Sequence, residues 1–218
     1  MPHAFKLHGS PHSPFTYKVA LMLRLSGAAF DFRYVSFQKK MQLTPEFRAL
    51  SRWRQVPVLE HQGRALCQSA AILEYLAETL GTFRAGDADA ALRVREWLYW
   101  DADRLAPPIS GCYGVSLAER KLLPLVFDPA IIDWYRRRAD TALTVLDANL
   151  AGRPFLAADQ ATIADICCYG HVAFAAPSGI DLARWPHLSA WSARIEALPR
   201  FKAPFDLLAM ADAEIGAA

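Results

Sequence analysis

Ser13 lies directly before a proline and an apolar run, in the stretch GSPHSPFTYKVALML of residues 9 to 23. A serine there can cap a helix, because its oxygen accepts a hydrogen bond from a first-turn N–H and Pro14 suits the first helical position. The same helix start offers free N–H groups and the positive end of the helix dipole to an anion, and a hydroxyl can donate a hydrogen bond to it. A thiolate held there would have a lowered pKa. Ser13 is therefore a candidate for a helix cap and for a thiolate site.

A second stretch with chemical potential is RQVPVLEHQGRALCQSAAILEYLAE, residues 54 to 78. Pro57 stands where a strand should begin and cannot donate to the sheet ladder, so it needs an edge position or a special bond such as a cis peptide. A cis bond would leave the N–H and C=O of Val56 free to pair with an extended, peptide-like ligand. Further on, Ser69 opens a helix, where its hydroxyl either caps the helix or binds a ligand carboxylate together with the helix N-terminus.

The cysteines and histidines form no recognised metal or redox motif. The four cysteines make no C-x-x-C pair and show no regular spacing, so neither a disulfide framework nor a zinc site is indicated. None of the six histidines belongs to an H-E-x-x-H or Cys/His set. We therefore expect no metal and a reducing compartment.

The elements that must position these residues alternate between strand and helix in the first third of the chain. Apolar alternation, β-branched and aromatic runs, helix-start signals and glycines mark them. In order they are a strand at 5–7, a helix at 15–25 closed by Gly27, a strand at 31–37, a short helix opened by Thr44, strands at 56–60 and 64–67 joined by a turn, and a helix from Ser69 to near Gly81. The predicted order is βαβαββα.

Beyond this module the pattern becomes helical. Residues 82–88, TFRAGDA, are polar and contain a glycine, and we place a linker there, between a first domain at 1–81 and an all-helical domain at 89–218. Ala139, Leu143, Leu146 and Leu150 fall on one helix face. Further helices are predicted at 92–105, 162–175 and 186–198.

The composition is that of an ordinary globular protein. With 218 residues, 53% hydrophobic, 21% charged and a net charge of +2, the chain resembles neither a disordered tail nor a basic nucleic-acid binder. The one basic run, Arg136 to Arg138, lies in a helical stretch and is interpreted as a solvated face rather than a phosphate-binding patch. No signal sequence and no apolar stretch of about 18 residues is present, so we expect a cytoplasmic protein without a membrane span.

Taken together, these stretches resemble the cytosolic glutathione S-transferases, most closely the serine-type phi, theta and related bacterial classes. The resemblance is carried by KLHGSPHSPFTYKVALML, TPEFRALSRWRQVPVLE and CQSAAILEYLAE in the first domain. In the second domain, ATIADI, residues 161–166, matches the family's helix-capping segment, where Thr162 and Asp165 are placed to form a capping box. The match is strong over residues 5–80 and looser beyond.

The resemblance implies a thioredoxin-like domain that binds glutathione as co-substrate, a helical domain that supplies a pocket for an apolar electrophile, and a homodimer. Ser13 matches the catalytic serine that stabilises the glutathione thiolate. The implied glutathione-binding residues are Lys40, Gln42, Gln55, Val56, Pro57, Gln68 and Ser69. The candidates for the electrophile pocket are Phe15, Trp100, Ile109, Cys112 and Tyr113, although aromatic residues at helical spacing are commonly core.

Two residues depart from the family pattern. Gln68 stands where an acidic residue usually pairs with the ligand's ammonium group, and a neutral carbonyl makes a weaker bond. Asp101 or Asp103 of a second subunit is a candidate to compensate, and each is equally interpretable as a solvated helix-end charge. Arg54 stands where glycine is common, and it either contacts a carboxylate or faces solvent.

The first functional hypothesis is a detoxifying glutathione transferase that adds the thiolate to an apolar electrophile, with its rate derived from thiolate stabilisation and from proximity. Two alternatives remain open. One is a non-catalytic glutathione-binding or regulatory protein on the same scaffold, because a fold does not guarantee an activity. The other is a glutathione-dependent peroxidase or disulfide reductase.

Overall fold

The computed structural model describes residues 4–208, which form two compact units. The first unit contains the described residues up to Thr82 and those from Pro199 onward, and the second runs from Phe83 to Leu198. None of the helices in the described residues combines the length and the apolar character that crossing a membrane requires.

The first unit contains a four-stranded mixed sheet in the order β2-β1-β3-β4. Its strands are β1 (Phe5–Gly9), β2 (Phe30–Tyr34), β3 (Val58–His61) and β4 (Arg64–Cys67). β1 pairs with β2 in parallel, and the pairs β1–β3 and β3–β4 are antiparallel. With its helices this is the predicted thioredoxin-like βαβαββα order, so the fold class is confirmed.

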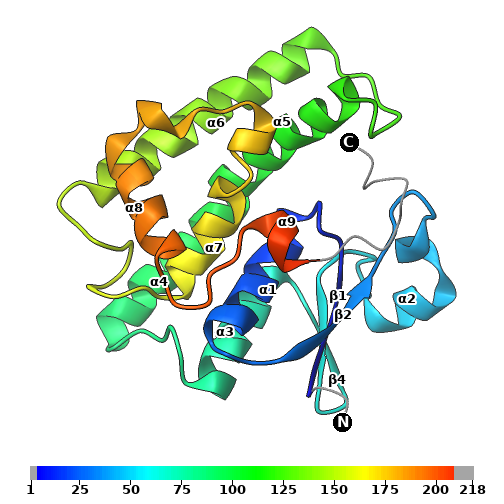
Figure 1. Cartoon of the computed structure of the whole chain (residues 1–218), viewed down its shortest axis with the longest axis horizontal. Coiled ribbons are helices and arrows are strands. Elements are labelled where there is room, and N and C mark those ends of the chain that lie inside the picture. The colour runs from blue at the N-terminus through cyan, green and yellow to red at the C-terminus, as the bar shows by residue number, and fades with distance from the viewer. Residues whose placement is uncertain (1–3, 209–218) are drawn as a thin grey trace. The chain divides into compact units, whose positions relative to one another are not determined.

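Helices cover both faces of this sheet. Figure 1 shows α1 (Pro14–Leu25) and α3 (Ser69–Leu80) together on one side of the strands and α2 (Pro45–Leu50) on the other. On the α2 side, Phe47 packs in a buried cluster with Val35 and Val58, next to Leu50 and Cys67. The helix starts are set locally, because Ser13 and Thr44 each cap a helix whose first residue is proline.

The predicted element boundaries are close to those of the structure but not identical. The second strand ends at Tyr34 rather than at residue 37, and the third begins at Val58 rather than at residue 56. A proline before Val58 explains the later start of the third strand, since Pro57 has no N–H for the ladder. The helix from Ser69 ends at Leu80 with Gly81 as its left-handed C-cap, as expected.

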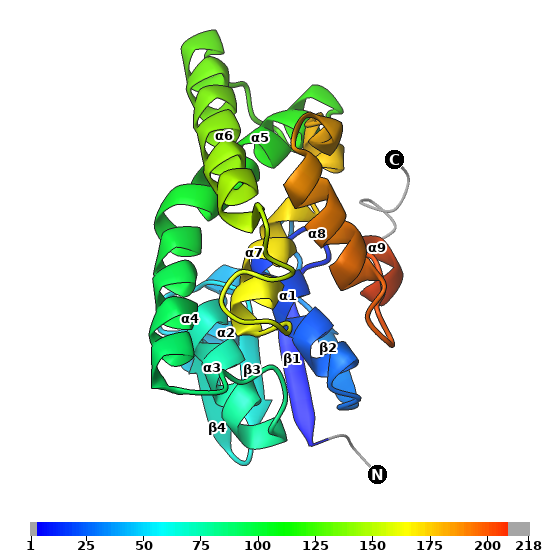
Figure 2. The same ribbon diagram turned by 90° about the vertical axis from the view of Figure 1, so that its left-hand side faces the viewer.

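The second unit is helical, as predicted. Its helices are α4 (Ala88–Trp100), α5 (Ala106–Glu119), α6 (Pro129–Leu150), α7 (Ile163–Val172) and α8 (Pro186–Glu196). A π-helical turn, Asp101–Leu105, joins α4 to α5, and 3-10 turns occur at Ala176–Ser178 and Leu182–Arg184. Helices α5 and α6 lie side by side in both views (Figures 1 and 2).

Helix α7 is the core of this unit, because every one of its residues is buried. The capping box predicted at its start is confirmed: the Asp165 carboxylate accepts a hydrogen bond from Thr162 N at 2.8 Å, and Thr162 Oγ1 accepts one from Ala164 N at 3.3 Å. The other oxygen of Asp165 accepts bonds from Leu156 N and Trp191 Nε1, both at 2.9 Å. One buried carboxylate thus joins three segments.

The C-terminal segment, 199–208, groups with the first unit, whereas the sequence placed everything after residue 88 in the helical domain. The reason is its contact with α1: the Tyr17 hydroxyl donates to the Lys202 carbonyl at 2.9 Å, and Arg24 Nε donates to the Arg200 carbonyl at 3.3 Å. The short helix α9 (Pro204–Leu207) packs against the same helix (Figure 1).

Candidate functional site

The candidate glutathione-binding residues of the first unit converge on one end of the sheet. The register pairs His8 with Val58 and Val58 with Cys67. The chain therefore leaves β1 toward Ser13, enters β3 from Pro57 and leaves β4 toward Gln68 at the same sheet end. Strand pairing therefore brings three loops that are far apart in sequence to the same end of the sheet.

Ser13 is the N-cap of α1. Its Oγ accepts a hydrogen bond from Thr16 N at 3.2 Å, and its own N–H donates to the Ser10 carbonyl at 3.0 Å. Capping uses a lone pair of the hydroxyl oxygen and leaves the hydroxyl hydrogen available for another acceptor. The two interpretations of Ser13 are therefore compatible, and the structure shows the cap directly.

The other hydroxyls of this loop have structural partners. Thr16 Oγ1 lies 3.4 Å from Ser10 N, and Ser10 Oγ lies 3.3 Å from His12 N, each as an acceptor. Thr16 also packs directly on β1, since a Cβ added to Gly9 would lie 2.2 Å from Thr16 Cγ2. Gly9 thus allows the first turn of α1 to approach the strand, a role that a lone glycine in the sequence does not reveal.

The Val56–Pro57 peptide bond is cis, as the sequence suggested. The strand ladder begins at Val58, so the peptide groups of Val56 lie outside the pairing of β3. Ser51 supports this loop: its hydroxyl donates to the Gln55 carbonyl at 3.0 Å and accepts from Gln55 N at 3.1 Å. Ser51 is fully buried. Its supporting role could not be predicted from the sequence, because a serine that bonds to the backbone 4 residues further along the chain belongs to no recognisable motif.

Gln68 and Gln55, predicted separately, are in contact. Gln68 Nε2 donates to Gln55 Oε1 at 3.3 Å, and Gln68 has a positive φ of 69° that turns the chain from β4 into α3. Ser69 is the first residue of α3, whereas Gln68 occupies the cap position and makes no side-chain cap bond there. The helix-cap interpretation of Ser69 is therefore wrong, and its buried hydroxyl lies beside the first N–H groups of the helix.

Lys40 and Gln42 follow β2, whose last residue Tyr34 is paired with Gly9 at the same sheet end. Lys40 is exposed with a left-handed φ of 53°, and Gln42 lies in the 3-10 turn Met41–Leu43. Within the described residues, Gln42 Oε1 is buried and has no hydrogen-bond partner. Such a side chain is unusual, because buried polar atoms are normally paired. This oxygen is an acceptor and would need a donor, so it does not itself support binding of a carboxylate.

The expectation for Asp101 is wrong. Its carboxylate is 1% exposed, with Oδ1 at 2.8 Å from His171 Nδ1 and Oδ2 accepting a bond from Cys167 Sγ at 3.2 Å. A carboxylate held inside its own helical unit is not presented to another subunit. Asp103 is exposed and lies 2.7 Å from Arg104 Nε, so its contribution stays a prediction.

The proposed electrophile-pocket residues fall into two groups. Ile109 is fully buried, and the Tyr113 ring packs edge-on against Phe174 with centroids 5.1 Å apart. Burial raises the pKa of Tyr113 to about 12, so its hydroxyl stays protonated at neutral pH. This placement favours the core interpretation for both. Phe15 and Trp100 are half-buried, each within its own unit.

Comparison with known proteins agrees with this architecture. Residues 7–82 match the family model of the glutathione S-transferase N-terminal domain, and residues 132–199 match that of the C-terminal domain. Glutathione S-transferase 3 of Zea mays is 30% identical over 206 residues, which cover 90% of this chain and 91% of that protein. Disulfide-bond oxidoreductase YfcG of Escherichia coli is 27% identical over 194 residues, or 86% of this chain and 88% of that protein.

A solved structure shows the same fold over most of both chains. It is a glutathione transferase family member from Pseudomonas fluorescens Pf-5 with two glutathione bound, at a TM-score of 0.79 and 27% identity, covering 92% of this chain and 91% of that one. The chain described here belongs to the glutathione S-transferase family of enzymes.

Proposed function

We propose that the chain binds glutathione at this end of the sheet and uses the Ser13 hydroxyl to stabilise the thiolate for transfer to an apolar electrophile. The observation that supports this most is the Ser13 geometry, in which Oγ accepts from Thr16 N and keeps its hydrogen for a sulfur acceptor. The helix dipole and the hydroxyl both favour the ionised thiol, so the bound thiol pKa falls. The thiolate sulfur then bonds to the electrophilic carbon as the leaving group departs or a π bond opens.

The remaining residues provide one partner for each part of the tripeptide. The backbone of Val56 pairs with the cysteinyl unit, in the manner of strand addition. Ser69 and the N-terminus of α3 bind the γ-glutamyl carboxylate, because a helix N-terminus favours an anion. Gln42 and Lys40 bind the glycine carboxylate, with the Gln42 amide nitrogen as donor.

The Gln55–Gln68 pair sets how the ligand's ammonium group is held. Gln68 Nε2 is engaged with Gln55, so the carbonyl oxygen of Gln68 is left to accept a bond from the ammonium. A neutral acceptor binds an ammonium more weakly than a carboxylate does. We therefore expect weaker glutathione binding than an acidic residue at position 68 would give.

A second candidate function is glutathione-dependent disulfide reduction. It is supported by the name of the E. coli relative, a disulfide-bond oxidoreductase, and by the two glutathione molecules in the Pseudomonas structure. In this reaction the first thiolate attacks a disulfide and releases one thiolate, and a second glutathione resolves the mixed disulfide, so that the substrate is reduced and glutathione is oxidised.

The deciding experiment is an ultraviolet difference titration of bound glutathione against pH, for the wild type and Ser13→Ala. We expect a bound thiol pKa well below that of free glutathione in the wild type, its return toward the free value in the variant, and turnover reduced by about 10²-fold. Ser10→Ala and Thr16→Ala are the matched controls. Equal losses in all three variants, or an unshifted thiol pKa in the wild type, would contradict the role of Ser13 and favour a non-catalytic binding protein.

Substrate class is tested separately, by comparing turnover on an aromatic halide, a hydroperoxide and a mixed disulfide. A preference for the halide supports the transferase, and a preference for either of the others supports the peroxidase or reductase. We further propose a cytoplasmic homodimer with a role in detoxification. Sedimentation of the purified chain tests the dimer, and fractionation of the source cells tests the cytoplasmic location.

A further inference from the structure

The connection between α5 and α6 is apolar, although loops at a protein surface are commonly polar. Residues 122–127 are LLPLVF, a run without a charge or a hydrogen-bonding side chain. The loop lies at one end of the α5–α6 pair, within the helical unit (Figure 1). A run of exposed apolar residues does not help a loop to fold in water, so its presence points to a function.

Two of these side chains, Leu122 and Phe127, are half-buried and hold the loop on α5. Lys121, with a left-handed φ of 60°, ends the helix, and the N–H of Leu122 donates to the Leu117 carbonyl at 2.8 Å. A helix end of this type commonly brings the two leucine side chains together. Phe127 lies near the same helix, since a Cβ added to Gly114 would be 3.7 Å from Phe127 Cζ. The loop is therefore anchored at both ends.

Between these anchors, Leu125 and Val126 project into solvent. Their exposed fractions are 54% and 101%, so the protein covers no part of Val126. Ile131 and Trp134 follow in the first two turns of α6, and each is 45% exposed. Because they are three residues apart, they share one face of the helix. We call Leu125, Val126, Ile131 and Trp134 the apolar tip.

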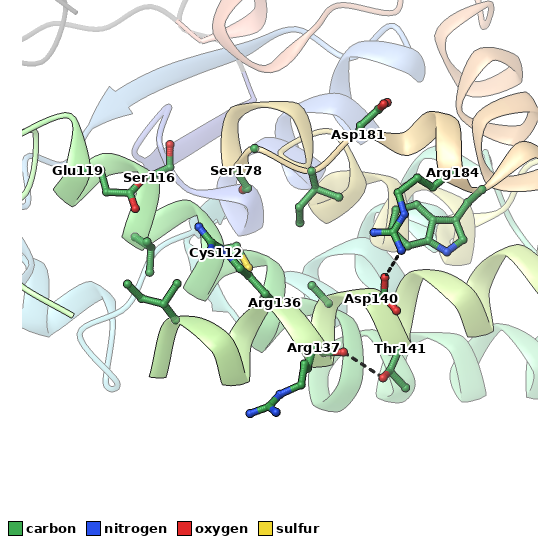
Figure 3. A pocket seen from close by; sticks show the side chains of 16 residues that line it. Cys112, Ser116, Glu119, Arg136, Arg137, Asp140, Thr141, Ser178, Asp181 and Arg184 are labelled. Atoms are coloured by element: carbon green, nitrogen blue, oxygen red, sulfur yellow. Dashed lines mark hydrogen bonds and ion pairs between the residues drawn. The ribbon is translucent and has the colours of Figure 1, made fainter. Parts of the chain in front are cut away.

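Basic side chains stand on both sides of the apolar tip. Arg120 and Lys121 are exposed at the end of α5. On α6, Arg138 lies over the Trp134 ring, with Cζ 4.9 Å from its centre, and Arg137 points away from the space between the two helices (Figure 3). A tryptophan ring beside guanidinium and ammonium groups suits the boundary between water and lipid.

The acidic residues near the apolar tip are fewer, and two of them are engaged by the protein. Asp128 caps α6 through its side chain, and Asp133 Oδ2 lies 3.6 Å from Arg137 Nη2. Glu119 borders the space between α5 and α6 (Figure 3). Residues 119–138 contain five basic and three acidic residues, so the neighbourhood of the apolar tip is net positive. This charge favours an anionic partner.

From these observations we infer that the apolar tip docks on an anionic lipid membrane. Leu125 and Val126 enter the boundary between headgroups and acyl chains, and Trp134 lies at the headgroups. Arg120 and Lys121 attract the negative surface, and the apolar and electrostatic contributions add. A side chain that protrudes fully fits a fluid lipid surface, whereas a protein partner would need a matching groove. The inference does not depend on the proposed function.

Flotation of the full chain with lipid vesicles tests the lipid requirement. The probes are vesicles of phosphatidylcholine alone and of phosphatidylcholine with about one-third phosphatidylserine. We expect binding to the anionic vesicles to be at least about tenfold tighter, and to weaken as salt is added. No binding to the anionic vesicles, or equal binding to both compositions, would overturn the inference.

Two pairs of variants locate the contact. Leu125 and Leu92 are both 54% exposed, and both belong to the helical unit. Leu125→Asp should weaken binding to the anionic vesicles at least about tenfold, because an inserted side chain becomes an anion, whereas Leu92→Asp should have little effect. Lys121→Gln should weaken binding about fivefold, and Lys202→Gln, on an exposed lysine of the first unit, should not. Equal effects within either pair would overturn the inference.

Sedimentation without lipid distinguishes a membrane from a second copy of the chain. Leu125→Asp replaces an exposed side chain, so the variant should keep the far-ultraviolet circular dichroism and the sedimentation coefficient of the wild type while it loses flotation. If Leu125→Asp changed the oligomeric state and the wild type did not float with anionic vesicles, the apolar tip would be a contact between copies. That result would overturn the inference of a lipid partner.

Discussion

At Ser13 one hydroxyl group can serve two partners because it has both a donor and acceptor sites. One lone pair accepts the bond from Thr16 N at 3.2 Å, which leaves the hydroxyl hydrogen to turn toward another acceptor. A cap of this kind costs about 1 kcal/mol to remove by alanine substitution. Loss of helix stability and loss of thiolate stabilisation in Ser13→Ala are therefore separate effects, and only the second changes the thiol pKa.

Gln68 stands where the family resemblance implies an acidic residue. Glutamate there would add a negative charge at the position proposed for the ligand's ammonium, so we expect Gln68→Glu to lower the Kd for glutathione about three- to tenfold. Calorimetric titration measures this change. N-acetylglutathione lacks the ammonium and is the control ligand: its Kd should not improve. A gain for both ligands, or for neither, would show that the ammonium is not at position 68.

Helices α5 and α6 depend on one glycine for their contact. Gly111→Ala would place its Cβ 2.3 Å from the Tyr135 ring, so the helices must separate or the ring must turn, at a cost of about 1 to 3 kcal/mol in the free energy of unfolding. Gly114 lies in the same helix, and a Cβ there would meet only Phe127 Cζ at 3.7 Å. Gly114→Ala should therefore be stabilising by up to about 1 kcal/mol through helix propensity. Urea denaturation of both variants measures the difference, and equal effects would refute the contact.

Strands β1 and β3 are joined by a charged group on one face of the sheet. Glu60 Oε1 lies 2.6 Å from His8 Nε2 and 3.4 Å from Lys6 Nζ. The hydrogen bond to His8, followed by the charges of His8 and Lys6, lowers the pKa of Glu60 below its ordinary value. Because the folded pKa is the lower one, the stabilisation is present above the unfolded pKa and is lost as pH falls through the folded value.

Glu60→Gln should therefore be less stable than the wild type at pH 6, by less than about 1 kcal/mol because the group is partly exposed. At pH 3 the difference should shrink. Paired denaturation curves at the two pH values measure it, with Lys6→Gln as a second variant that removes one of the two cations. A difference that grows on acidification would contradict the direction of the pKa shift.

At the scale of elements, the sequence predicted what is encoded locally. The Ser13 and Thr44 caps and the capping box at α7 each involve residues 3 apart, so they could be recognised without the fold. The burial of Asp101 could not, because its partner His171 is 70 residues away. The bonds from Ser51 to the backbone of Gln55 could not be predicted for a different reason. A buried serine that bonds to the backbone of a loop has no characteristic sequence pattern. Ser13, Val56 and Ser69 were predicted from the chemistry of their residues and the other site residues from the family resemblance, and strand pairing explains why they share one end of the sheet.

At the scale of the whole molecule, the chain consists of two compact units, and we expect the effect of a buried substitution to be largest in its own unit. Asp165 is the clearest case. Its two oxygens accept bonds from Leu156, Thr162 and Trp191, which belong to a loop, the start of α7 and α8 of the helical unit. Burial raises the pKa of this carboxyl, while the hydrogen bonds act in the opposite direction. Because the folded pKa is the higher one, the free energy of unfolding falls as pH rises from the unfolded pKa through the folded one.

Asp165→Ala leaves several buried donors without an acceptor, and we expect a loss of about 2 to 4 kcal/mol in the free energy of unfolding of the helical unit. Hydrogen exchange, read on separate peptides, should show faster exchange in α7 and α8 and unchanged exchange in α1 and α3. Asp159→Ala removes an exposed carboxylate of the preceding loop and is the matched control. Equally faster hydrogen exchange in both units would show that the two units unfold together, and it would contradict the expected restriction of the effect to the helical unit.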